Sequence, residues 1–257
     1  MTVVRVRAIV VHELKILRQD PTFLIIFTLM PLLIMAFLKP TFRAALILVG
    51  NPGANGAEQA VPGMAVLFAL LLVGNVGYAV FREHGWNTWP RLVASPANGV
   101  EIMIGKSVTP LLALCAQLTV LFVVGGVLFD LRVQGSIVGL VLVAASLAVT
   151  LVCMGLLLIS VCRTVLQLQA GTYLGAMVLA GVGGALTPIS SLPGWARHVA
   201  PAAPTYWAMR GFRSAILVPG SWTVVLWPVL VLLGFATFFA LVAASRFRVG
   251  DVKIGWA

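Results

Sequence analysis

The chain has 257 residues, of which 61% are hydrophobic and only 9% are charged, and its mean hydropathy is +1.07. A soluble domain carries about a quarter charged residues, so this composition excludes a soluble protein and indicates an integral membrane protein. The formal net charge is +10. Most basic residues lie just outside apolar runs, where they are expected to meet anionic headgroups, and nucleic-acid binding is disfavoured.

Residues 1–20 are predicted to form an amphipathic helix that lies in the membrane interface. A helical wheel separates the basic side chains of this stretch from one apolar face, which holds Val3, Val6, Val10, Leu14 and Leu17. Asp20 and Pro21 then cap and open the first spanning helix. A cleaved signal peptide is the alternative. It fits poorly, because Lys39-Pro40 follows the apolar run where a small-residue cleavage site would be needed.

Six long uncharged runs follow, and each is long enough to cross the hydrocarbon core of a bilayer. They cover residues 21–38, 59–81, 107–129, 133–162, 164–196 and 214–245. Within them we expect transmembrane helices at 21–38, 59–81, 107–129, 136–162, 167–188 and 222–245. The predicted fold class is therefore an all-α integral membrane protein, a single transmembrane domain over residues 1–257 with six spans and both termini on one side.

The segment 82–106, between the second and third spans, is the longest charged interruption in the chain and resembles a small folded element. Residues 87–90 read Asn-Thr-Trp-Pro, which suits a helix start with proline in the first turn. Ser95-Pro96 then ends that helix, and Asn98 with Glu101 forms a capping box that opens the next. The result is a short surface helix suited to pressing against something outside the lipid, carrying Trp86, Trp89, Arg91 and Leu92.

The second half of the chain contains a small-residue motif and a long outer segment. Gly171 and Gly175 in the fifth span let helices approach closely, either within the chain or against a second copy. Residues 189–221 are rich in proline, tryptophan and arginine, and aromatic residues such as Trp195 and Trp207 suit the membrane interface. We expect short, re-entrant-like helices there that dip partly back towards the membrane.

Orientation follows from the distribution of basic residues. Eleven of the 17 lysines and arginines lie on the side that holds the two termini and segment 82–106, and six lie on the other side. The positive-inside rule therefore predicts that the termini and this segment are cytoplasmic.

Catalytic and energy-coupling motifs are missing from the sequence. The six runs contain no Asp, Glu, Lys or Arg to relay coupling ions, and the three cysteines form no CxxC pair. The sequence also lacks a phosphate-binding GxxxxGK[ST] loop and the GxSxG and HExxH patterns of hydrolases. We therefore predict no enzyme activity, no metal site and no cofactor in this chain, so energy for uphill transport must enter through a partner. A few polar side chains in the runs either line a substrate path or form interhelical hydrogen bonds: Asn75, Thr172, Tyr173 and Thr187.

These features resemble the permease subunit of ABC-2 type exporters, a group that includes daunorubicin-resistance-like drug exporters and exporters of lipids or polysaccharides. The resemblance covers nearly the whole chain. One part of it is the amphipathic start that runs into the first span. A second part lies in segment 82–106, which reads Arg82-Glu83-x-Gly85, then Arg91-Leu92-x-Ala94-Ser95-Pro96, then Gly105-Lys106. The third part follows the fifth span and reads Leu192-Pro193-x-Trp195, Pro201, Pro204-x-Tyr206 and Arg210.

The resemblance implies a function and an assembly. It implies two permease copies, identical or related, in the bacterial inner membrane, bound to two separate cytoplasmic ATPase subunits that hold ATP and Mg. Residues 82–96 would form the coupling helix seated in a cleft of the ATPase. The implied ATPase-coupling residues are Arg82, Glu83, Gly85, Trp86, Trp89, Arg91, Leu92, Ser95, Pro96 and Lys106. The implied outer-segment motif is Pro193, Trp195, Pro204, Tyr206 and Arg210.

The substrate class is only weakly indicated. Apolar spans favour a hydrophobic or amphipathic substrate such as a drug, lipid or glycolipid, and the fold alone does not fix the choice. An energy-independent channel or scramblase and a membrane anchoring subunit stay open as alternative functions. For Glu83 we hypothesise a pairing with a basic group on the ATPase or on the amphipathic helix; the alternative is a solvated interfacial charge.

Overall fold

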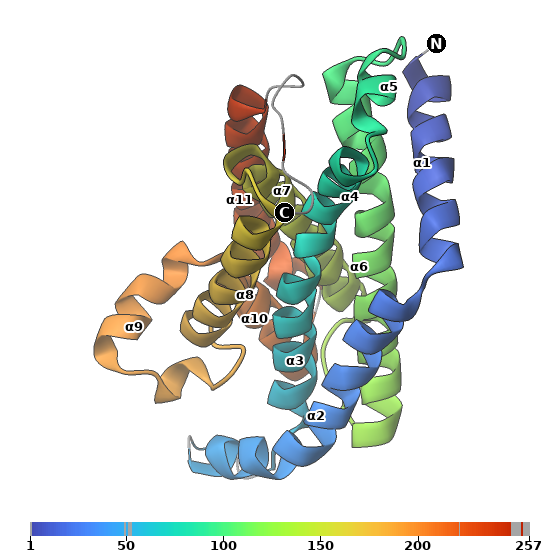
Figure 1. The fold of residues 1–257 in the computed structure, drawn as a ribbon. Helices are drawn as coiled ribbons and strands as arrows, with labels where there is room; N and C mark the ends of the chain where they lie inside the picture. Colours follow the sequence, from blue (N-terminus) through green and yellow to red (C-terminus); the bar gives the residue numbers. More distant parts are fainter. Residues whose placement is uncertain (1, 49, 51–52, 221, 248–252, 254–257) are drawn as a thin grey trace.

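A computed structural model describes residues 2–48, 50, 53–220, 222–247 and 253, and every regular element in these ranges is a helix. Six stretches are long and apolar enough to cross a membrane, which confirms the predicted all-α fold with six spans. They are α2 (Thr22–Leu48), α3 (Ala57–Leu72) continuing into α4 (Gly74–Gly85), α6 (Gly99–Phe129), α7 (Ile137–Val161), α8 (Val165–Val182) and α11 (Leu226–Arg246). Figure 1 shows them as one bundle.

Helix α1 (Thr2–Gln19) precedes the bundle and lies alongside the first half of α6, with which it makes extensive contacts (Figure 1). It ends where Asp20 accepts a hydrogen bond from the Thr22 N–H at 3.2 Å, as the capping pattern predicted. Hydrogen bonds from the Thr22 side chain and backbone lower the pKa of the Asp20 carboxyl below its ordinary value. Only two residues therefore separate α1 from the first candidate span.

Helix α2 extends ten residues past the predicted end of the first span and passes through two prolines. Pro31 has no N–H, so the carbonyl of Phe27 lacks its intrahelical partner. The side-chain amide of Gln117, on α6, donates to that carbonyl at 2.8 Å. A neighbouring helix thus supplies the hydrogen bond that the proline removes, which is how prolines are tolerated inside spanning helices.

The second span is the centre of the bundle, because 78% of its most apolar window is buried, the largest share among the six. It is also interrupted. At Val73 the backbone hydrogen bonds change to three-residue spacing, from the Val73 N–H to Leu70 and from the Val76 N–H to Val73. Helix α4 therefore continues α3 through a tight turn within the span, and α4 rests closely on α7 at Gly155.

The outer segment after α8 contains two helices of different character. Helix α9 (Gly194–Val199) stands away from the bundle in Figure 1, and Trp195 on it is 68% exposed. Helix α10 (Pro204–Leu217) packs among α3, α7 and α11, with Phe212 fully buried. The Thr205 hydroxyl also donates to the Leu179 carbonyl at 2.6 Å, which ties α10 to the end of α8.

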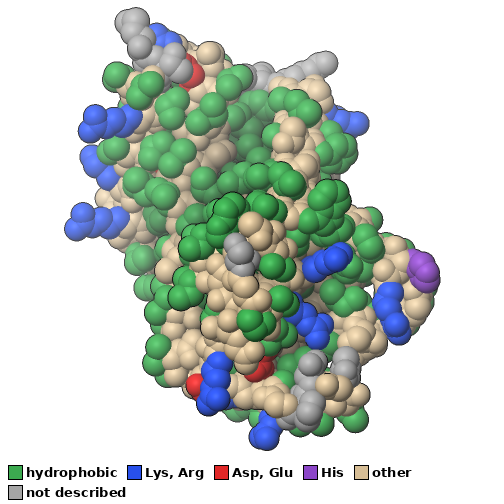
Figure 2. Space-filling model, turned by 180° about the vertical axis from the view of Figure 1, so that it is seen from behind, with side chains coloured by type: hydrophobic (Ala, Val, Ile, Leu, Met, Phe, Trp, Pro, Cys, Tyr) green, Lys and Arg blue, Asp and Glu red, His purple; other side chains and the backbone are tan. Residues whose placement is uncertain are grey.

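The surface of the molecule matches a protein surrounded by lipid. Figure 2 shows a face on which hydrophobic side chains predominate and acidic side chains are few. Helix α2 has only 11% of its most apolar window buried within the chain, so most of its length faces outward. These outward faces are available to lipid or to another transmembrane chain.

Candidate functional site

Lys106 is the centre of a buried group of charges near the N-terminal end of α6. Its ammonium nitrogen lies 2.6 Å from Oε1 of Glu13 and 2.9 Å from Oε1 of Glu83, and it also donates to the Ala79 carbonyl at 3.1 Å. The lysine is 2% exposed and the two glutamates are 5% and 7% exposed. A lysine buried this deeply must be paired, because an isolated buried charge is very costly.

The remaining carboxylate oxygens of this group are also bonded. Arg82 contacts Oε2 of Glu13 at 2.7 Å, and the Thr88 hydroxyl donates to Oε2 of Glu83. We call Glu13, Arg82, Glu83 and Lys106 the charge cluster. Two ionised acids and two ionised bases give it no net charge, so its burial leaves no uncompensated ion.

Three helices meet in the charge cluster. Glu13 comes from α1, Arg82 and Glu83 from the end of α4, and Lys106 from α6. The close approach of α1 depends on Gly105, because a Cβ there would lie 2.8 Å from Cβ of Ile9. One helical turn beyond Ile9, Glu13 faces the lysine that follows the glycine. In the Gly105-Lys106 pair, the glycine thus allows the close contact between α1 and α6, and the lysine supplies the buried positive charge.

The loop between α4 and α6 folds back over the charge cluster. Helix α5 (Trp89–Val93) begins with proline in its first turn, as predicted. Trp89 is 7% exposed and stacks on His84 with ring centroids 4.6 Å apart, while Trp86 is 57% exposed with the Arg82 guanidinium 5.2 Å from its ring. Of the two tryptophans predicted on the surface of this loop, only Trp86 is therefore exposed.

The capping box that opens α6 is confirmed. The Glu101 N–H donates to Oδ1 of Asn98 at 2.8 Å, and the Asn98 N–H donates to Oε2 of Glu101 at 2.9 Å. Arg5 of α1 lies 3.6 Å from that Glu101 oxygen and donates to the Pro96 carbonyl at 2.6 Å. The cap therefore also ties the start of α1 to the loop.

The structure gives Glu83 a partner that the sequence hypothesis did not name. The hypothesis placed the basic group on an ATPase or on the N-terminal helix, whereas Lys106 of α6 binds Glu83 within the chain. The N-terminal helix contributes an acid, Glu13, which sequence reasoning missed. The sequence did contain a signal that Glu13 faces inward. Glu13 is the only acidic residue before Asp20, and it lies one helical turn from the apolar residues Ile9 and Ile16.

The other residues predicted for coupling surround the charge cluster without joining it. Gly85 ends α4, Ser95 donates to the Leu92 carbonyl at 2.6 Å, and Leu92 is half-buried. Arg91 and Pro96 are exposed on the loop. The predicted set therefore divides into a buried group that joins helices and an exposed group that faces outward.

The residues predicted to line a substrate path are not brought together within one chain. Thr172 is buried against Gly74, the neighbour of Asn75, and its hydroxyl has no hydrogen-bond partner among the described residues. Tyr173 is 48% exposed on α8, and Thr187 is exposed in the turn after that helix. Thr172 and Asn75 thus lie near the break in the second span, and the other two lie elsewhere.

The outer-segment motif is divided between α9 and α10. Pro193 precedes α9 and Trp195 is exposed on it, whereas Pro204 is buried at the first position of α10. Tyr206 contacts the Trp207 ring, and the exposed Arg210 lies 5.5 Å from the same ring. The prolines of this motif begin helices, and its aromatic residues and arginine lie at or near the surface.

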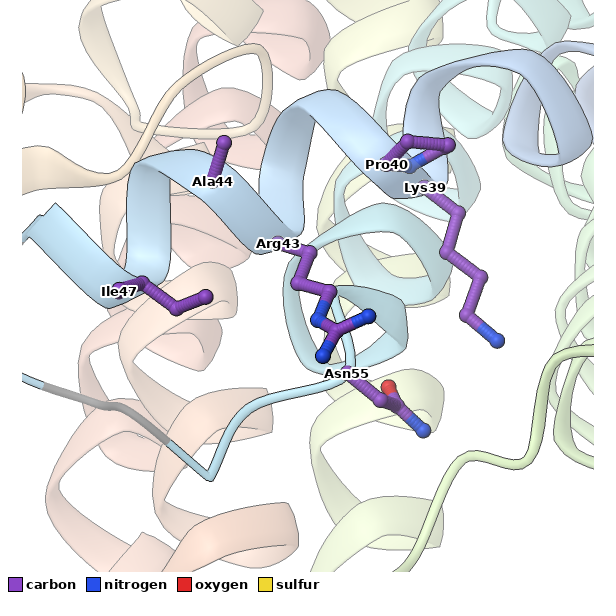
Figure 3. A pocket seen from close by; sticks show the side chains of 6 residues that line it. All are labelled: Lys39, Pro40, Arg43, Ala44, Ile47 and Asn55. Carbon is purple, nitrogen blue, oxygen red and sulfur yellow. The ribbon is translucent and has the colours of Figure 1, made fainter.

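Two basic residues, Lys39 and Arg43, lie near each other at the opposite end of the bundle from the charge cluster. Lys39 donates to the Phe129 carbonyl at 2.8 Å and Asn55 donates to the Asp130 carbonyl at 2.6 Å, so both satisfy the end of α6. With Arg43 they line a shallow pocket of about 360 Å³ (Figure 3). Figure 3 shows the three side chains pointing to the same side of α2.

A larger cavity of about 650 Å³ lies between α1 and the loop that carries α5, and Lys106 contributes to its wall. Its lining includes His12, which together with Glu13 and Glu83 places three metal-ligand atoms within 4.8 Å of one another. Lys106 already bonds both carboxylates, so a metal ion would have to displace the ammonium group. The arrangement is that of an ion-pair network.

Comparison with known proteins identifies the family. Residues 4–217 match the family model described as "ABC-2 type transporter". The chain is 26% identical over 188 residues to "Probable multidrug ABC transporter permease YbhR" of Escherichia coli (strain K12), covering 71% of this chain and 50% of that protein. It is 28% identical over 202 residues to "Inner membrane transport permease YhhJ" of Escherichia coli (strain K12), covering 77% and 52%.

A eukaryotic protein is also similar. "ABC transporter G family member 20" of Dictyostelium discoideum is 28% identical over 150 residues, which are 57% of this chain and 20% of that protein. The chain spans about half the length of the two bacterial relatives. The family match extends over most of the chain, and the sequence resemblance is confirmed: this multi-pass membrane protein belongs to the ABC-2 type transporter family.

Proposed function

We propose that this chain is the membrane permease subunit of an ATP-driven exporter in a bacterial inner membrane. A separate cytoplasmic ATPase would hold ATP and Mg and supply the energy. The substrate would be a hydrophobic or amphipathic molecule, such as a drug, lipid or glycolipid. Family membership and the named permease relatives support this function, and the uncharged spans support the substrate class.

The observation that carries the proposal is the charge cluster. It joins the loop bearing α5 to three helices at once, through Thr88 and Glu83 to α6 and through Arg82 and Glu13 to α1. A force applied to α5 would therefore move α4, α6 and α1 together. Since α1 leads directly into α2, the force would reach the first three spans.

The exposed part of the same loop supplies a docking surface for the ATPase. Trp86 and Arg91 are exposed next to the buried cluster. An exposed tryptophan and an arginine are the residue types that most often anchor protein interfaces. With the termini and this loop in the cytoplasm, as the distribution of basic residues predicts, this surface would face the ATPase.

Two features of the bundle support a permease with moving spans and a second copy. The hydrogen-bond spacing of the second span tightens to three residues at Val73, and this is where we expect α4 to tilt relative to α3. On α8 a Cβ added to Gly171 would lie 3.7 Å from Cδ2 of Leu158, but one added to Gly175 would meet nothing within 4 Å, so packing inside the described chain does not explain Gly175. A second permease would cover this open face.

The test is co-purification with the ATPase encoded by the neighbouring reading frame. The wild type is expected to retain the ATPase in detergent, and Arg91→Glu is expected to lose it. Arg163→Glu is the matched control, because Arg163 is an exposed arginine in the turn between α7 and α8. Retention by the control and loss with Arg91→Glu support the docking surface. Failure of the wild type to bind any ATPase would contradict the proposal.

A second measurement separates docking from transmission. Glu83→Gln removes one charge of the buried cluster without altering the exposed surface. We expect the ATPase to bind this variant normally, while substrate no longer stimulates ATP hydrolysis. If Glu83→Gln left stimulated hydrolysis unchanged, the charge cluster would have no part in transmission.

A further inference from the structure

We propose that the cavity between α1 and the α5 loop binds the headgroup of an anionic phospholipid. Its volume of about 650 Å³ falls within the range of small-ligand sites, roughly 300–1,000 Å³. One wall is α1 and the other is the loop from Glu83 to Ala97, with Lys106 between them. The cavity is thus built by segments far apart in the sequence.

The charge of the ligand follows from which groups in the cavity are still free to bond. Both oxygens of Glu13 are already bonded to bases, and those of Glu83 are bonded to Lys106 and Thr88. The charges of these two acids are therefore already compensated by Lys106 and Arg82, and they add no net negative charge to the cavity. Arg91 and His12 also line the cavity, and neither side chain has a hydrogen bond or ion pair among the residues that the structure describes.

Arg5 adds a third basic group at the same cavity. Its Nη1 donates to the Pro96 carbonyl and lies 3.6 Å from Oε2 of Glu101, and its guanidinium retains other N–H groups that can donate. Three basic side chains from two walls therefore face a cavity whose acids are neutralised. Such an arrangement favours an anion with several acceptor oxygens, and a phosphate group meets this requirement.

The apolar lining indicates that the phosphate is attached to a hydrophobic body. Ile9 and Ile16 of α1 and Trp86 and Leu92 of the loop all line the cavity, so part of its wall is apolar. A free phosphate would leave these surfaces unfilled, whereas the glycerol backbone and upper acyl chains of a phospholipid would cover them. The position fits as well, because Gln19 lines the cavity three residues before Thr22, where the first candidate span begins.

Trp86 and Arg91 also belong to the surface proposed to dock the ATPase, so the site is tested by fluorescence quenching on the full chain without an ATPase, and a failure of the export proposal does not decide this outcome. The protein is reconstituted in phosphatidylcholine vesicles that contain a minor fraction of dibrominated phosphatidylglycerol. A matched set contains dibrominated phosphatidylcholine at the same fraction. The chain has seven tryptophans, so the signal of Trp86 is taken as the difference between the wild type and Trp86→Phe.

We expect brominated phosphatidylglycerol to quench Trp86 several-fold more effectively than brominated phosphatidylcholine. Arg91→Gln is expected to reduce this preference by roughly fivefold, the effect of removing a full cation at a membrane surface, and His12→Gln is expected to reduce it less. Arg163→Gln, which removes an exposed arginine outside the cavity, should preserve it. Ala8→Phe should also reduce it, because the ring adds bulk to the cavity without changing its charge.

Three results would overturn the proposal. Equal quenching by the two brominated lipids would show that the cavity does not select an anionic headgroup. An equal loss of preference in Arg163→Gln would assign the effect to overall charge. Relief of quenching by inorganic phosphate or glycerol phosphate would assign the cavity to a soluble anion instead of a lipid.

Discussion

Lys106 is the residue on which the N-terminal end of the bundle depends. Glu13 is 93 positions away in the sequence and Glu83 is 23 away, yet both bond the same ammonium group. Removing Lys106 alone leaves two buried carboxylates with a single base, Arg82, to compensate both, and Glu83 loses its ion-pair partner. Removing one partner of a buried ion pair destabilises a protein far more than replacing the whole pair with uncharged residues.

Lys106→Met is therefore expected to destabilise the protein by about 3–5 kcal/mol. Lys15→Met is the matched control, because Lys15 is exposed on α1, and its effect should stay within about 0.5 kcal/mol. Thermal unfolding of the purified variants in detergent measures both. Adding Glu13→Gln and Glu83→Gln to Lys106→Met should restore much of the loss; equal instability of this triple variant would show that charge is not the cause.

Gln117 gives a second prediction at the residue scale, because its amide replaces the hydrogen bond that Pro31 removes from Phe27. Gln117→Leu should cost about 0.5–2 kcal/mol, the range found for interhelical hydrogen bonds in membranes. In a Pro31→Ala background the alanine N–H can bond the Phe27 carbonyl, so the same substitution should cost less. A double-mutant cycle in thermal unfolding measures the difference, and equal costs in both backgrounds would contradict this interpretation.

At the scale of the elements, the sequence predicts local structure well where residues within one helical turn decide it. The Asn98 capping box and the proline start of α5 depend on neighbours within a few residues, and both form as expected. The end of α2 was harder to predict, because Lys39-Pro40 resembles a helix stop. The helix continues to Leu48, and Lys39 bonds the end of α6, a contact set by tertiary structure.

The candidate site shows the same limit. Arg82, Glu83 and Lys106 could be selected from the sequence, because they fall in a recognisable motif. Glu13 could not be paired with them, because nothing local links α1 to α6. Only the contact at Gly105 and Ile9 brings the two helices close enough for the acid to reach the lysine.

Helix packing between α4 and α7 gives a prediction at this scale. A Cβ on Gly155 would lie 2.7 Å from Cβ of Val76, a branched side chain beside the break in the second span. Gly155→Ala is expected to destabilise the protein by about 1–3 kcal/mol, as overpacking does. Gly175→Ala meets open space and should be neutral or stabilising by up to about 1 kcal/mol. Thermal unfolding in detergent compares the two, and equal effects would argue against a tight α4–α7 contact.

At the scale of the whole molecule, a single chain leaves apolar helix faces uncovered. One of these faces, on α8, contains a glycine that packing within the described chain does not explain. Leu174, Met177 and Val178 on α8 are between 49% and 69% exposed beside Gly175, whose Cβ position is open. Lipid can cover such side chains, but it gives no reason for a glycine among them. A second helix approaching at close range does.

Gly175→Leu is therefore expected to weaken self-association of the permease by roughly tenfold while leaving the stability of the monomer unchanged. Gly126→Leu is the matched control, since Gly126 on α6 also faces open space. Analytical ultracentrifugation in detergent measures the monomer–dimer equilibrium. An equal effect of the two leucines, or none from Gly175→Leu, would remove α8 from the dimer contact.

Helix α6 connects the two ends of the molecule. Its 31 residues span about 46 Å at the usual rise of an α-helix. Lys106 lies near one end, and at the other end the Phe129 carbonyl accepts a hydrogen bond from Lys39. Thermodynamic linkage between two such ends is reciprocal. Suppose that breaking the ion pairs of Lys106 also releases Lys39 from the Phe129 carbonyl. An anion that binds Lys39 and draws it away from that carbonyl must then favour the broken state of the Lys106 ion pairs by the same free energy. A solute bound at the Lys39 end of α6 would thereby shift the equilibrium of the charge cluster at the other end of the same helix.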